Sequence, residues 1–297
     1  MAITEFVVIS GKGGTGKTTV TASLAAFIGK AVLTDADVDG ANLELALQAN
    51  LVHEESIVGG KKALIKPTLC TACGRCADLC RFGAVIPGAN HASGGIIMAI
   101  DTDLCEGCGL CIRMCPSKAI TFRESKGGSW RHSKTRWGDL FHARLVPGGE
   151  NSGKLVALLR RKARELASEQ GTDFMLTDGP PGAGCPVIAT LTGAHRVLVV
   201  TEPTPSGMSD AERVINLCRH FRRTVAIAIN KFDLHSGMTS KIEAWAQSSS
   251  IPIVGHLPYD PVVPKAIRQG IPVLALPPSA WSKALIAMAQ RLELPSA

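Results

Sequence analysis

The sequence predicts an α/β protein with a mostly parallel sheet, interrupted by a small α+β insertion that is rich in cysteine. Short apolar runs alternate with Ala-rich helical stretches at both ends of the chain. Eight of the ten cysteines fall in two regular runs between residues 70 and 115. Alternating strands and helices are typical of a parallel sheet, and clustered cysteines in a chain of 297 residues indicate metal ligands rather than disulfides.

The composition excludes disorder and a membrane-spanning helix. Hydrophobic residues make up 45% of the chain, which is enough for a full core. No uninterrupted apolar run reaches about 18 residues, as a spanning helix requires. The start of the chain carries FVVIS and no basic leader, so we expect a cytoplasmic protein.

Strands of the main domain are expected wherever a short apolar run ends in polar residues. Open α/β sheets bind ligands at the carboxyl ends of their strands, so these polar residues are candidates for a binding site. The expected strands are 5–10, 31–34, 174–177, 196–200, 224–229 and 253–257, and the first two flank a helix at 18–28.

An internal repeat interrupts this alternation. Leu69-Cys70 recurs as Leu104-Cys105, and Ala84-Val85 recurs as Ala119-Ile120, at an offset of 35 residues. Such self-similarity indicates a duplicated module. We therefore expect residues 61–123 to form a domain inserted into a core made of residues 1–60 and 124–297.

The segment GKGGTGKTT, which follows the first strand, is the strongest nucleotide signal. Its glycines let successive backbone N–H groups surround a phosphate, and the N-terminus of the following helix adds positive potential. In this pattern Lys17 contacts the β- and γ-phosphates and Thr18 holds Mg²⁺. The candidate nucleotide-binding residues are Gly11, Lys12, Gly13, Gly14, Thr15, Gly16, Lys17, Thr18 and Thr19.

Aspartates after two strands are candidates for the magnesium site. Asp35, Asp37 and Asp39 follow the second strand, and Asp178 ends the strand at 174–177. Carboxylates in such positions suit Mg²⁺ and the orientation of a water molecule. A plain acidic turn at Asp39-Gly40 is the other interpretation.

The second lysine of the loop makes GKGGTGKT resemble the MinD/ParA-like branch of P-loop ATPases, which includes the nitrogenase iron protein and Mrp-type iron–sulfur carriers. The resemblance implies an ATPase that forms a nucleotide-dependent dimer, with itself or with a similar ATPase. It implies that Lys12 reaches the nucleotide of a facing subunit and that Asp37 positions the attacking water. In TDGPPGAG it implies that Asp178 holds Mg²⁺ through water and that Gly182 donates a backbone N–H to the γ-phosphate.

Base recognition is open between two patterns. NKFD, with Asn230 and Asp233, fits the motif with which many GTPases recognise guanine. Members of the MinD/ParA-like branch use the asparagine and a later loop around adenine, and Pro258 and Asp260 in LPYD resemble that loop. The second lysine of the P-loop favours ATP over GTP.

The two CxxCxxCxxxC runs have the spacing of bacterial two-cluster ferredoxins, in which the fourth cysteine of each run serves the other cluster. The resemblance implies two 4Fe-4S clusters, and zinc is a weak alternative because it favours longer spacers between cysteine pairs. Arg81 stands where the first run would have a proline. The first set is Cys70, Cys73, Cys76 and Cys115, and the second is Cys105, Cys108, Cys111 and Cys80.

The net charge does not indicate nucleic acid as a partner. It is formally +7, and two clusters with their thiolates would lower it to about +3. The local basic stretches are interpreted as solvated helix faces. They consist of Arg160, Arg161, Lys162 and Arg164, and of Arg219, Arg222 and Arg223.

For several single residues, ordinary packing and a functional role are both considered. Cys185 lies where the nitrogenase iron protein has a cluster ligand, but a second cysteine is absent between 123 and 181, so a small buried side chain is the preferred interpretation. Cys218 is expected to be packed in the core. Trp130 and Trp137 either cover the join between domains or pack ordinarily.

Two further segments are compared with the same ATPases. In PGGENSGK, Ser152 is expected to cap a helix, and a nucleotide or dimer contact by Lys154 is the alternative. The stretch 279–294 is amphipathic but poor in Lys and Arg, so we expect it to dock on the sheet rather than on a membrane.

Together these features predict an ATPase that couples its nucleotide state to electron transfer with a redox partner protein. A carrier of iron–sulfur clusters, as in Mrp-type proteins, is the alternative. A positioning ATPase is the least favoured interpretation.

Overall fold

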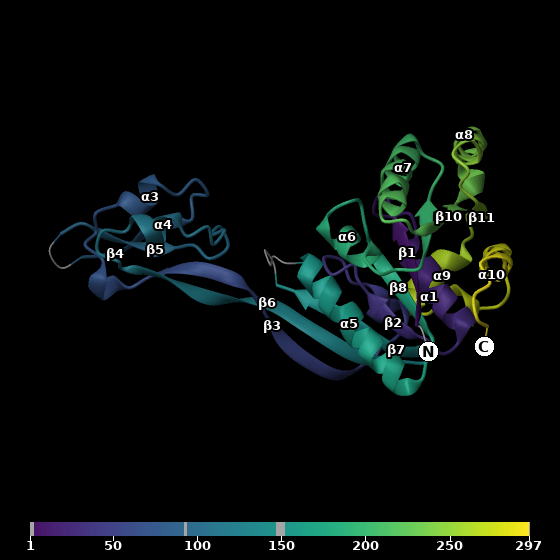
Figure 1. Cartoon of the computed structure of the whole chain (residues 1–297), viewed down its shortest axis with the longest axis horizontal. Coiled ribbons are helices and arrows are strands. Elements are labelled where there is room, and N and C mark those ends of the chain that lie inside the picture. The colour runs from purple at the N-terminus through teal and green to yellow at the C-terminus, as the bar shows by residue number, and fades with distance from the viewer. Residues whose placement is uncertain (1–2, 92–93, 147–151, 297) are drawn as a thin grey trace. The chain divides into compact units, whose positions relative to one another are not determined.

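The computed structural model describes residues 3–91, 94–146 and 152–296, and it divides into two compact units. The first unit comprises Met1–Glu55, Ser129–Arg144 and Ser152–Ala297. The second comprises Ser56–Gly128 with a short segment that begins at Leu145. Strands β3 (Asn50–Ile65) and β6 (Ile120–Thr135) contribute residues to both units (Figure 1). The sequence-based boundaries at 61 and 123 fall inside these two strands.

The main sheet has the strand order β11-β10-β9-β1-β8-β2-β7-β6-β3. Every neighbouring pair from β11 to β7 is parallel. β6 and β7 are joined by two residues, a connection that only antiparallel neighbours can make. The remaining strands are β1 (Thr4–Ser10), β2 (Val32–Asp35), β7 (Gly138–Leu145), β8 (Phe174–Pro181), β9 (Arg196–Thr201), β10 (Thr224–Asn230) and β11 (Ile253–Leu257).

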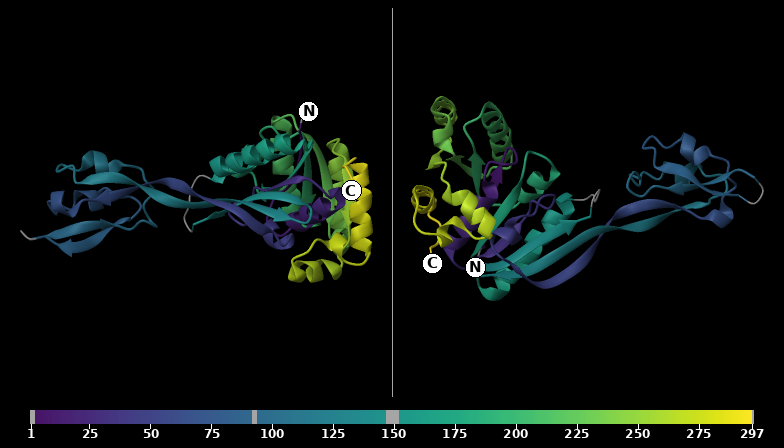
Figure 2. Two further views of the ribbon diagram at one scale, coloured as in Figure 1. Left: turned by 90° about the horizontal axis from the view of Figure 1, so that it is seen from below. Right: turned by 180° about the vertical axis from the view of Figure 1, so that it is seen from behind.

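Helices cover both faces of the parallel part of the sheet (Figure 2). Along β1, Phe6 and Val8 belong to one buried cluster and Val7 and Ile9 to another, as expected for a strand buried on both sides. The helices are α1 (Lys17–Ile28), α2 (Leu43–Ala46), α5 (Ser152–Gln170), α6 (Cys185–Leu191), α7 (Pro205–His220), α8 (Ser236–Ser248), α9 (Val262–Gln269) and α10 (Ala280–Arg291), with short 3-10 turns η2 (Phe232–Leu234) and η3 (Val273–Ala275).

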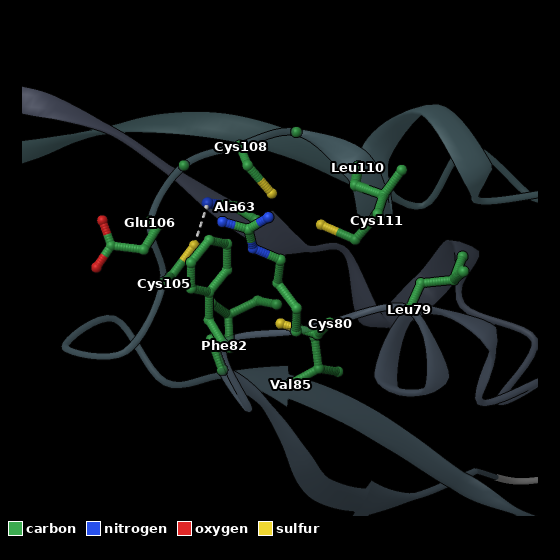
Figure 3. Close-up of a pocket in the computed structure, with 15 residues that line it drawn as sticks. Ala63, Leu79, Cys80, Phe82, Val85, Cys105, Glu106, Cys108, Leu110 and Cys111 are labelled. Atoms are coloured by element: carbon green, nitrogen blue, oxygen red, sulfur yellow. Dashed lines mark hydrogen bonds between the residues drawn. The ribbon is translucent and has the colours of Figure 1, made fainter.

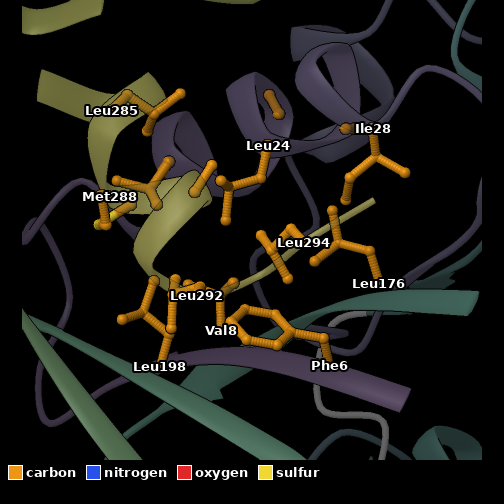
Figure 4. Packing of buried hydrophobic residues seen from close by; sticks show 14 of the residues in the cluster. Phe6, Val8, Leu24, Ile28, Leu176, Leu198, Leu285, Met288, Leu292 and Leu294 are labelled. Carbon is orange, nitrogen blue, oxygen red and sulfur yellow. The ribbon is translucent and has the colours of Figure 1, made fainter. Parts of the chain in front are cut away.

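The C-terminal helix α10 packs into the core. It begins with a capping box between Ser279 and Ser282. Leu285, Met288 and Leu292 lie against side chains of α1 and of the sheet (Figure 4). The prediction that this helix docks on the sheet is therefore confirmed. Among the described residues, the structure has no helix that is long and apolar enough to span a bilayer.

Replacing Leu285 with alanine should lower the free energy of unfolding by about 2–5 kcal/mol, because its side chain is fully buried and a cavity would remain. Denaturant unfolding of the two proteins checks this. Ile286→Ala is the matched control, since its side chain is 36% exposed, and we expect a much smaller loss.

Three strands of the main sheet are missing from the sequence-based prediction. β3, β6 and β7 contain glycines and many charged residues, so their apolar alternation is weak. Cross-strand side-chain pairs support them instead: Arg131 and Ser129 of β6 both hydrogen-bond the Glu54 carboxylate of β3. Residues 124–137, expected as a connecting segment, are therefore mostly strand.

Other differences are small or concern packing. β8 continues to Pro181, because it pairs with β1 as far as Ser10 and with β2 as far as Asp35. Trp130 stacks near Phe141, and Trp137 packs against the core cluster, so both pack ordinarily within the first unit.

The second unit carries the repeat. Each cysteine run forms a short helix that follows a glycine with positive φ: Gly74 before α3 (Arg75–Asp78) and Gly109 before α4 (Leu110–Met114). These two glycines are 35 residues apart, which is the offset of the repeat. The unit also contains η1 (Pro67–Leu69) and the antiparallel pair of β4 (Val85–Asn90) and β5 (Ile96–Ile100).

Candidate functional site

The phosphate-binding loop lies between β1 and α1 and is fixed by its glycines. Gly16 has a φ of 90°, and a Cβ there would lie 2.4 Å from the Asn230 side-chain nitrogen. A Cβ at Gly11 would lie 2.3 Å from the backbone of Asp210 on α7. No other residue type fits either position without a shift of its neighbours. The loop thus lies against the end of β10 and against α7.

Lys17 lies at the centre of the candidate nucleotide site. Its side chain is 6% exposed, and Nζ lies 3.1 Å from Asp178 Oδ2 and 3.3 Å from Asp37 Oδ2. Asp178 also accepts hydrogen bonds of 2.7 Å from Thr18 and from Thr21. The structure therefore brings Lys17, Thr18, Asp37 and Asp178 together, as the sequence predicts, and adds Thr21, which the motif did not single out.

The charges in this site perturb one another. Burial lowers the pKa of Lys17, but Asp178, Asp37 and Asp35 more than offset this, so its pKa lies above the ordinary value. Burial, with repulsion from Asp178, raises the pKa of Asp37, although Lys17 opposes the shift. The site thus holds more carboxylates than its single buried lysine neutralises. A divalent cation would relieve that excess of negative charge.

Asp35 differs from the other carboxylates because it organises the backbone. It accepts hydrogen bonds from the N–H groups of Asp37, Asn42 and Leu43, at 3.0–3.1 Å. Burial and the nearby Asp178 raise its pKa to about 8. Asp39, in contrast, is exposed in a turn.

Stability without nucleotide should depend on the protonation of Asp35. The folded protein retains its proton up to about pH 8, whereas the unfolded chain releases it near pH 3.8. Stability contributed by this group is therefore present below about pH 4 and is lost as the pH rises to about 8. We expect the melting temperature to fall less between pH 5 and pH 8 in Asp35→Asn than in the native protein. Thermal unfolding of both proteins at pH 5 and at pH 8 measures the difference. An unchanged slope would contradict the assignment.

Lys12 forms its contacts within the same chain. Its Nζ lies 2.7 Å from Glu202 and donates to the hydroxyls of Thr204 and Ser206. Glu202 also pairs with Lys231, at 3.1 Å. The role of Lys12 towards a facing subunit stays a prediction. Sequence analysis missed Glu202, although its place just after β9 was a usable signal.

The Gly182 backbone N–H is already hydrogen-bonded within the chain in this structure. Its N–H donates to the Ser10 carbonyl at 3.0 Å. The expected hydrogen bond to a γ-phosphate would require that bond to open. With a φ of 88°, Gly182 occupies a conformation that other residues rarely adopt.

The residues predicted around the base form hydrogen bonds with neighbouring loops in this structure. Asn230 donates to the Thr15 carbonyl at 2.7 Å, and Trp281 donates to Asn230 at 3.4 Å. Asp233 accepts from the N–H of Tyr259, next to Pro258, at 2.7 Å. The Asp260 carboxylate accepts hydrogen bonds from the N–H of Val262, at the start of α9, and from the N–H of Trp281. Their contact with a base stays a prediction.

Two interpretations of single residues were wrong. Cys185 is exposed rather than buried, because it begins α6 directly after the glycine-rich loop at 182–184. Arg160 is buried rather than solvated, because it forms a bidentate pair with the fully buried Glu5 of β1 and donates to two carbonyls of the α6 region.

Other expectations have mixed outcomes. Arg161 and Arg164 are partly exposed, and Cys218 is fully buried, as expected. Lys154 is exposed on α5. Residues 147–151 of the preceding motif and the Ser152 side chain lie outside the described residues.

The cysteines of the second unit line two cavities. A cavity of about 300 Å³ is lined by one cysteine of the first run and three of the second. Their side chains turn towards it, together with apolar groups such as Phe82 and Val85 (Figure 3). The four cysteines are Cys80, Cys105, Cys108 and Cys111.

The second cavity is lined by the other four cysteines of the two runs and has a smaller volume. It measures about 20 Å³, so its walls would have to move apart to admit a cluster. Cys76 and Cys111, one from each set, are close enough to interact electrostatically. The four cysteines are Cys70, Cys73, Cys76 and Cys115.

Backbone N–H groups donate hydrogen bonds to two of the cysteine sulfurs. The Ala63 N–H donates to Cys105 Sγ at 3.5 Å, and the Ala119 N–H donates to Cys115 Sγ at 3.3 Å. Burial raises the pKa of Cys76 and Cys111, and nearby thiols reinforce the shift. Thiolates at those two positions therefore need a positive partner.

Each cavity is lined by four thiols, and thiolates are the ligands of iron–sulfur clusters. Among the described residues, no group of three or more His, Cys, Asp or Glu side chains is arranged to hold one metal ion. Four thiols around a cavity suit an inorganic cluster, which fills the space between its ligands. The cavity bounded by the set that contains Cys80 measures about 300 Å³, and the cavity bounded by the set that contains Cys70 measures about 20 Å³.

Comparisons with known proteins agree with the nucleotide site. The sequence matches the CbiA family, described as the CobQ/CobB/MinD/ParA nucleotide binding domain, over residues 6–273. An uncharacterized protein of Methanocaldococcus jannaschii is 32% identical over 272 residues, which cover 91% of this chain and 89% of that protein. The iron-sulfur cluster carrier protein of Pyrococcus horikoshii is 23% identical over 97% of this chain and 85% of its own length.

A solved structure shares the fold. The septum site-determining protein MinD of Pyrococcus horikoshii, in complex with Mg-ADP, aligns over 98% of this chain and 96% of its own, with a TM-score of 0.59 and 19% identity. The α/β core with its mostly parallel sheet is therefore like that of MinD. Because the family match extends from β1 to η3, this chain belongs to the CobQ/CobB/MinD/ParA family of nucleotide-binding domains.

Proposed function

We propose that the protein hydrolyses Mg-ATP and couples its nucleotide state to electron transfer through two 4Fe-4S clusters. The observation that carries the proposal is the membership of the larger cavity, which takes Cys80 from the first run and Cys105, Cys108 and Cys111 from the second. This crossed set is the one that two-cluster ferredoxins use. It occurs in the same chain as a family nucleotide-binding domain.

The nucleotide site supplies the ATPase part of the proposal. Lys17 would exchange its carboxylate partners for the β- and γ-phosphates, which leaves Asp37 and Asp178 available for other roles. Thr18 and Asp178, already 2.7 Å apart, would hold Mg²⁺, with Asp178 acting through water. Asp37 would then orient the attacking water, since it lies beside Lys17 and remains partly exposed.

The cysteine unit supplies the redox part. When bound, 4Fe-4S clusters accept and release single electrons at potentials set by their surroundings. Cys76 and Cys111 interact electrostatically, so the two sets lie close to each other within the unit. Arg81 lines the larger cavity and stacks on Phe82, with 4.8 Å from its guanidinium carbon to the ring centroid. Its positive charge would favour the reduced state there.

The proposal includes a nucleotide-dependent dimer, either of two identical chains or with a similar ATPase. Lys12 is the residue that would cross to the facing nucleotide. To do so it must leave Glu202, Thr204 and Ser206 of its own chain. A redox protein would serve as electron donor or acceptor.

A cluster carrier is the second candidate, because the similar protein of Pyrococcus horikoshii is named an iron-sulfur cluster carrier. A carrier must release its clusters to an acceptor. Incubation of the loaded protein with an apo-ferredoxin distinguishes the two functions, since electron transfer requires that both clusters stay bound.

Anaerobic redox titration, followed by electron paramagnetic resonance with and without Mg-ATP, tests the proposal. We expect about eight irons per chain and a nucleotide-dependent change in signal or midpoint potential. Fewer than about four irons per chain, or signals that Mg-ATP leaves unchanged, would contradict the proposal. Transfer of clusters to the apo-ferredoxin would select the carrier function.

A further inference from the structure

We infer that Glu44 is the positioning residue that connects the nucleotide-sensing loop with the two strands leading into the cysteine unit. The inference rests on the proposed function, because it assigns the path by which the two halves influence each other. Glu44 lies on α2, directly after the loop that contains Asp37. Its side chain is 15% exposed.

The nucleotide side of this path is the loop held by Asp35. The Asp35 carboxylate accepts the N–H groups of Asn42 and Leu43, so the start of α2 is tied to the end of β2. Asp37, inside the same loop, contacts Lys17. Exchange of that contact for a phosphate would therefore act on the residues just before Glu44.

The Glu44 carboxylate is bound by groups of β6 and β7. Arg144 of β7 donates to Oε1 from Nη2 at 2.7 Å and from Nε at 3.2 Å. On the other oxygen, Oε2, His142 Nδ1 lies at 3.3 Å and Arg131 Nη1 at 4.0 Å. Burial lowers the pKa of His142 to about 4, so its ring is neutral at neutral pH, and its Nε2 lies 2.9 Å from the Ser133 hydroxyl oxygen.

Arg131 extends the contact to the neighbouring strand. It donates to Glu54 Oε1 from Nε at 2.9 Å and from Nη2 at 2.7 Å. Glu54 lies on β3 and Arg131 on β6, so one guanidinium joins Glu44 to both strands. Ser129 and Trp130 add hydrogen bonds to Glu54 and Glu55. A displacement of Glu44 would therefore reach β3 and β6 together.

The other ends of the same two strands touch the cysteines. Near the end of β3, Ala63 donates its N–H to Cys105 Sγ, and Lys62 donates to the Cys105 carbonyl at 2.5 Å. Ile65 of β3 and Ile120 of β6 line the smaller cavity. Both strands are continuous between these contacts and the Glu44 cluster (Figure 1).

Hydrogen–deuterium exchange on the full, cluster-loaded chain tests the inference with a readout that is independent of activity. In the native protein, a non-hydrolysable ATP analogue with Mg²⁺ should change exchange in 38–46 and also in 59–65 and 120–125. In Glu44→Gln, the change in 38–46 should remain, and the change in the other two segments should fall by about five-fold or more. Glu243→Gln is the matched control, because it removes the carboxylate from an ion pair with His256 instead.

Arg144→Gln is a second variant that tests the same contact if Glu44→Gln does not fold. Its side chain is 58% exposed, and its loss removes the two hydrogen bonds to Glu44 Oε1. We expect the same selective loss, of smaller size. A native-sized response of 59–65 and 120–125 in both variants would overturn the inference and leave the proposed function intact. No nucleotide response of those segments in the native protein would overturn both.

Discussion

Replacing Lys17 with alanine should lower kcat for Mg-ATP hydrolysis by at least about 100-fold, the usual loss when one charged group that stabilises a transition state is removed. Lys17 is the only buried lysine among the described residues, and it is within 3.3 Å of two carboxylates. In this structure, the nearby Lys12 and Lys231 pair with Glu202. A steady-state assay of phosphate release measures the effect.

The same substitution should also destabilise the nucleotide-free protein by about 3 kcal/mol, because it leaves Asp37 and Asp178 without their buried partner. Burial raises the pKa of Asp37, so protonation of this carboxyl relieves part of that cost and the loss should become smaller as the pH falls. Lys30→Ala, at the exposed end of the same helix region, is the control, and it should retain both activity and stability. Hydrolysis by Lys17→Ala at more than about a tenth of the native rate would contradict the role of Lys17.

The parts of the fold that follow from sequence are those in which one local rule dominates. The parallel strands were visible because burial on both faces makes them short continuous apolar runs. The P-loop was visible because its glycines are required by backbone geometry, as the close approach of Asn230 to Gly16 shows. In both cases the residue type is dictated within a few positions of the chain.

The parts that sequence analysis missed depend on contacts between distant residues. β3 and β6 are held by Arg131 and Glu54, which are 77 residues apart. Arg160 looked like part of an exposed basic face, yet Glu5, 155 residues away, draws it into the interior. A local sequence pattern does not predict these ion pairs, because a charged residue taken alone is most often exposed to solvent.

These long-range contacts also explain why the coupling path was invisible in the sequence. The motifs identified a nucleotide site and a set of cysteines, but not what lies between them. Glu44 belongs to no motif, and its importance arises only because Arg131, Arg144 and His142 surround it. The communication proposed for this protein therefore depends on the segments that local patterns describe worst.

Pairs of cysteine substitutions should show which thiols share a cluster. Cys108→Ala should lose about four of eight irons per chain, because one cluster loses a ligand. Adding Cys80→Ala should cause little further loss, since both side chains line the same cavity. Adding Cys73→Ala instead should remove nearly all the remaining iron, because Cys73 lines the other cavity.

The double variants also distinguish clusters whose ligands come from both cysteine runs from clusters held by a single run. If each run held its own cluster, Cys80 would group with Cys73, and the double variant of Cys80 and Cys108 would lose all its iron. Cys185→Ala is the control, since Cys185 is exposed on α6 and lines neither cavity. It should retain the native iron content and the native paramagnetic signals.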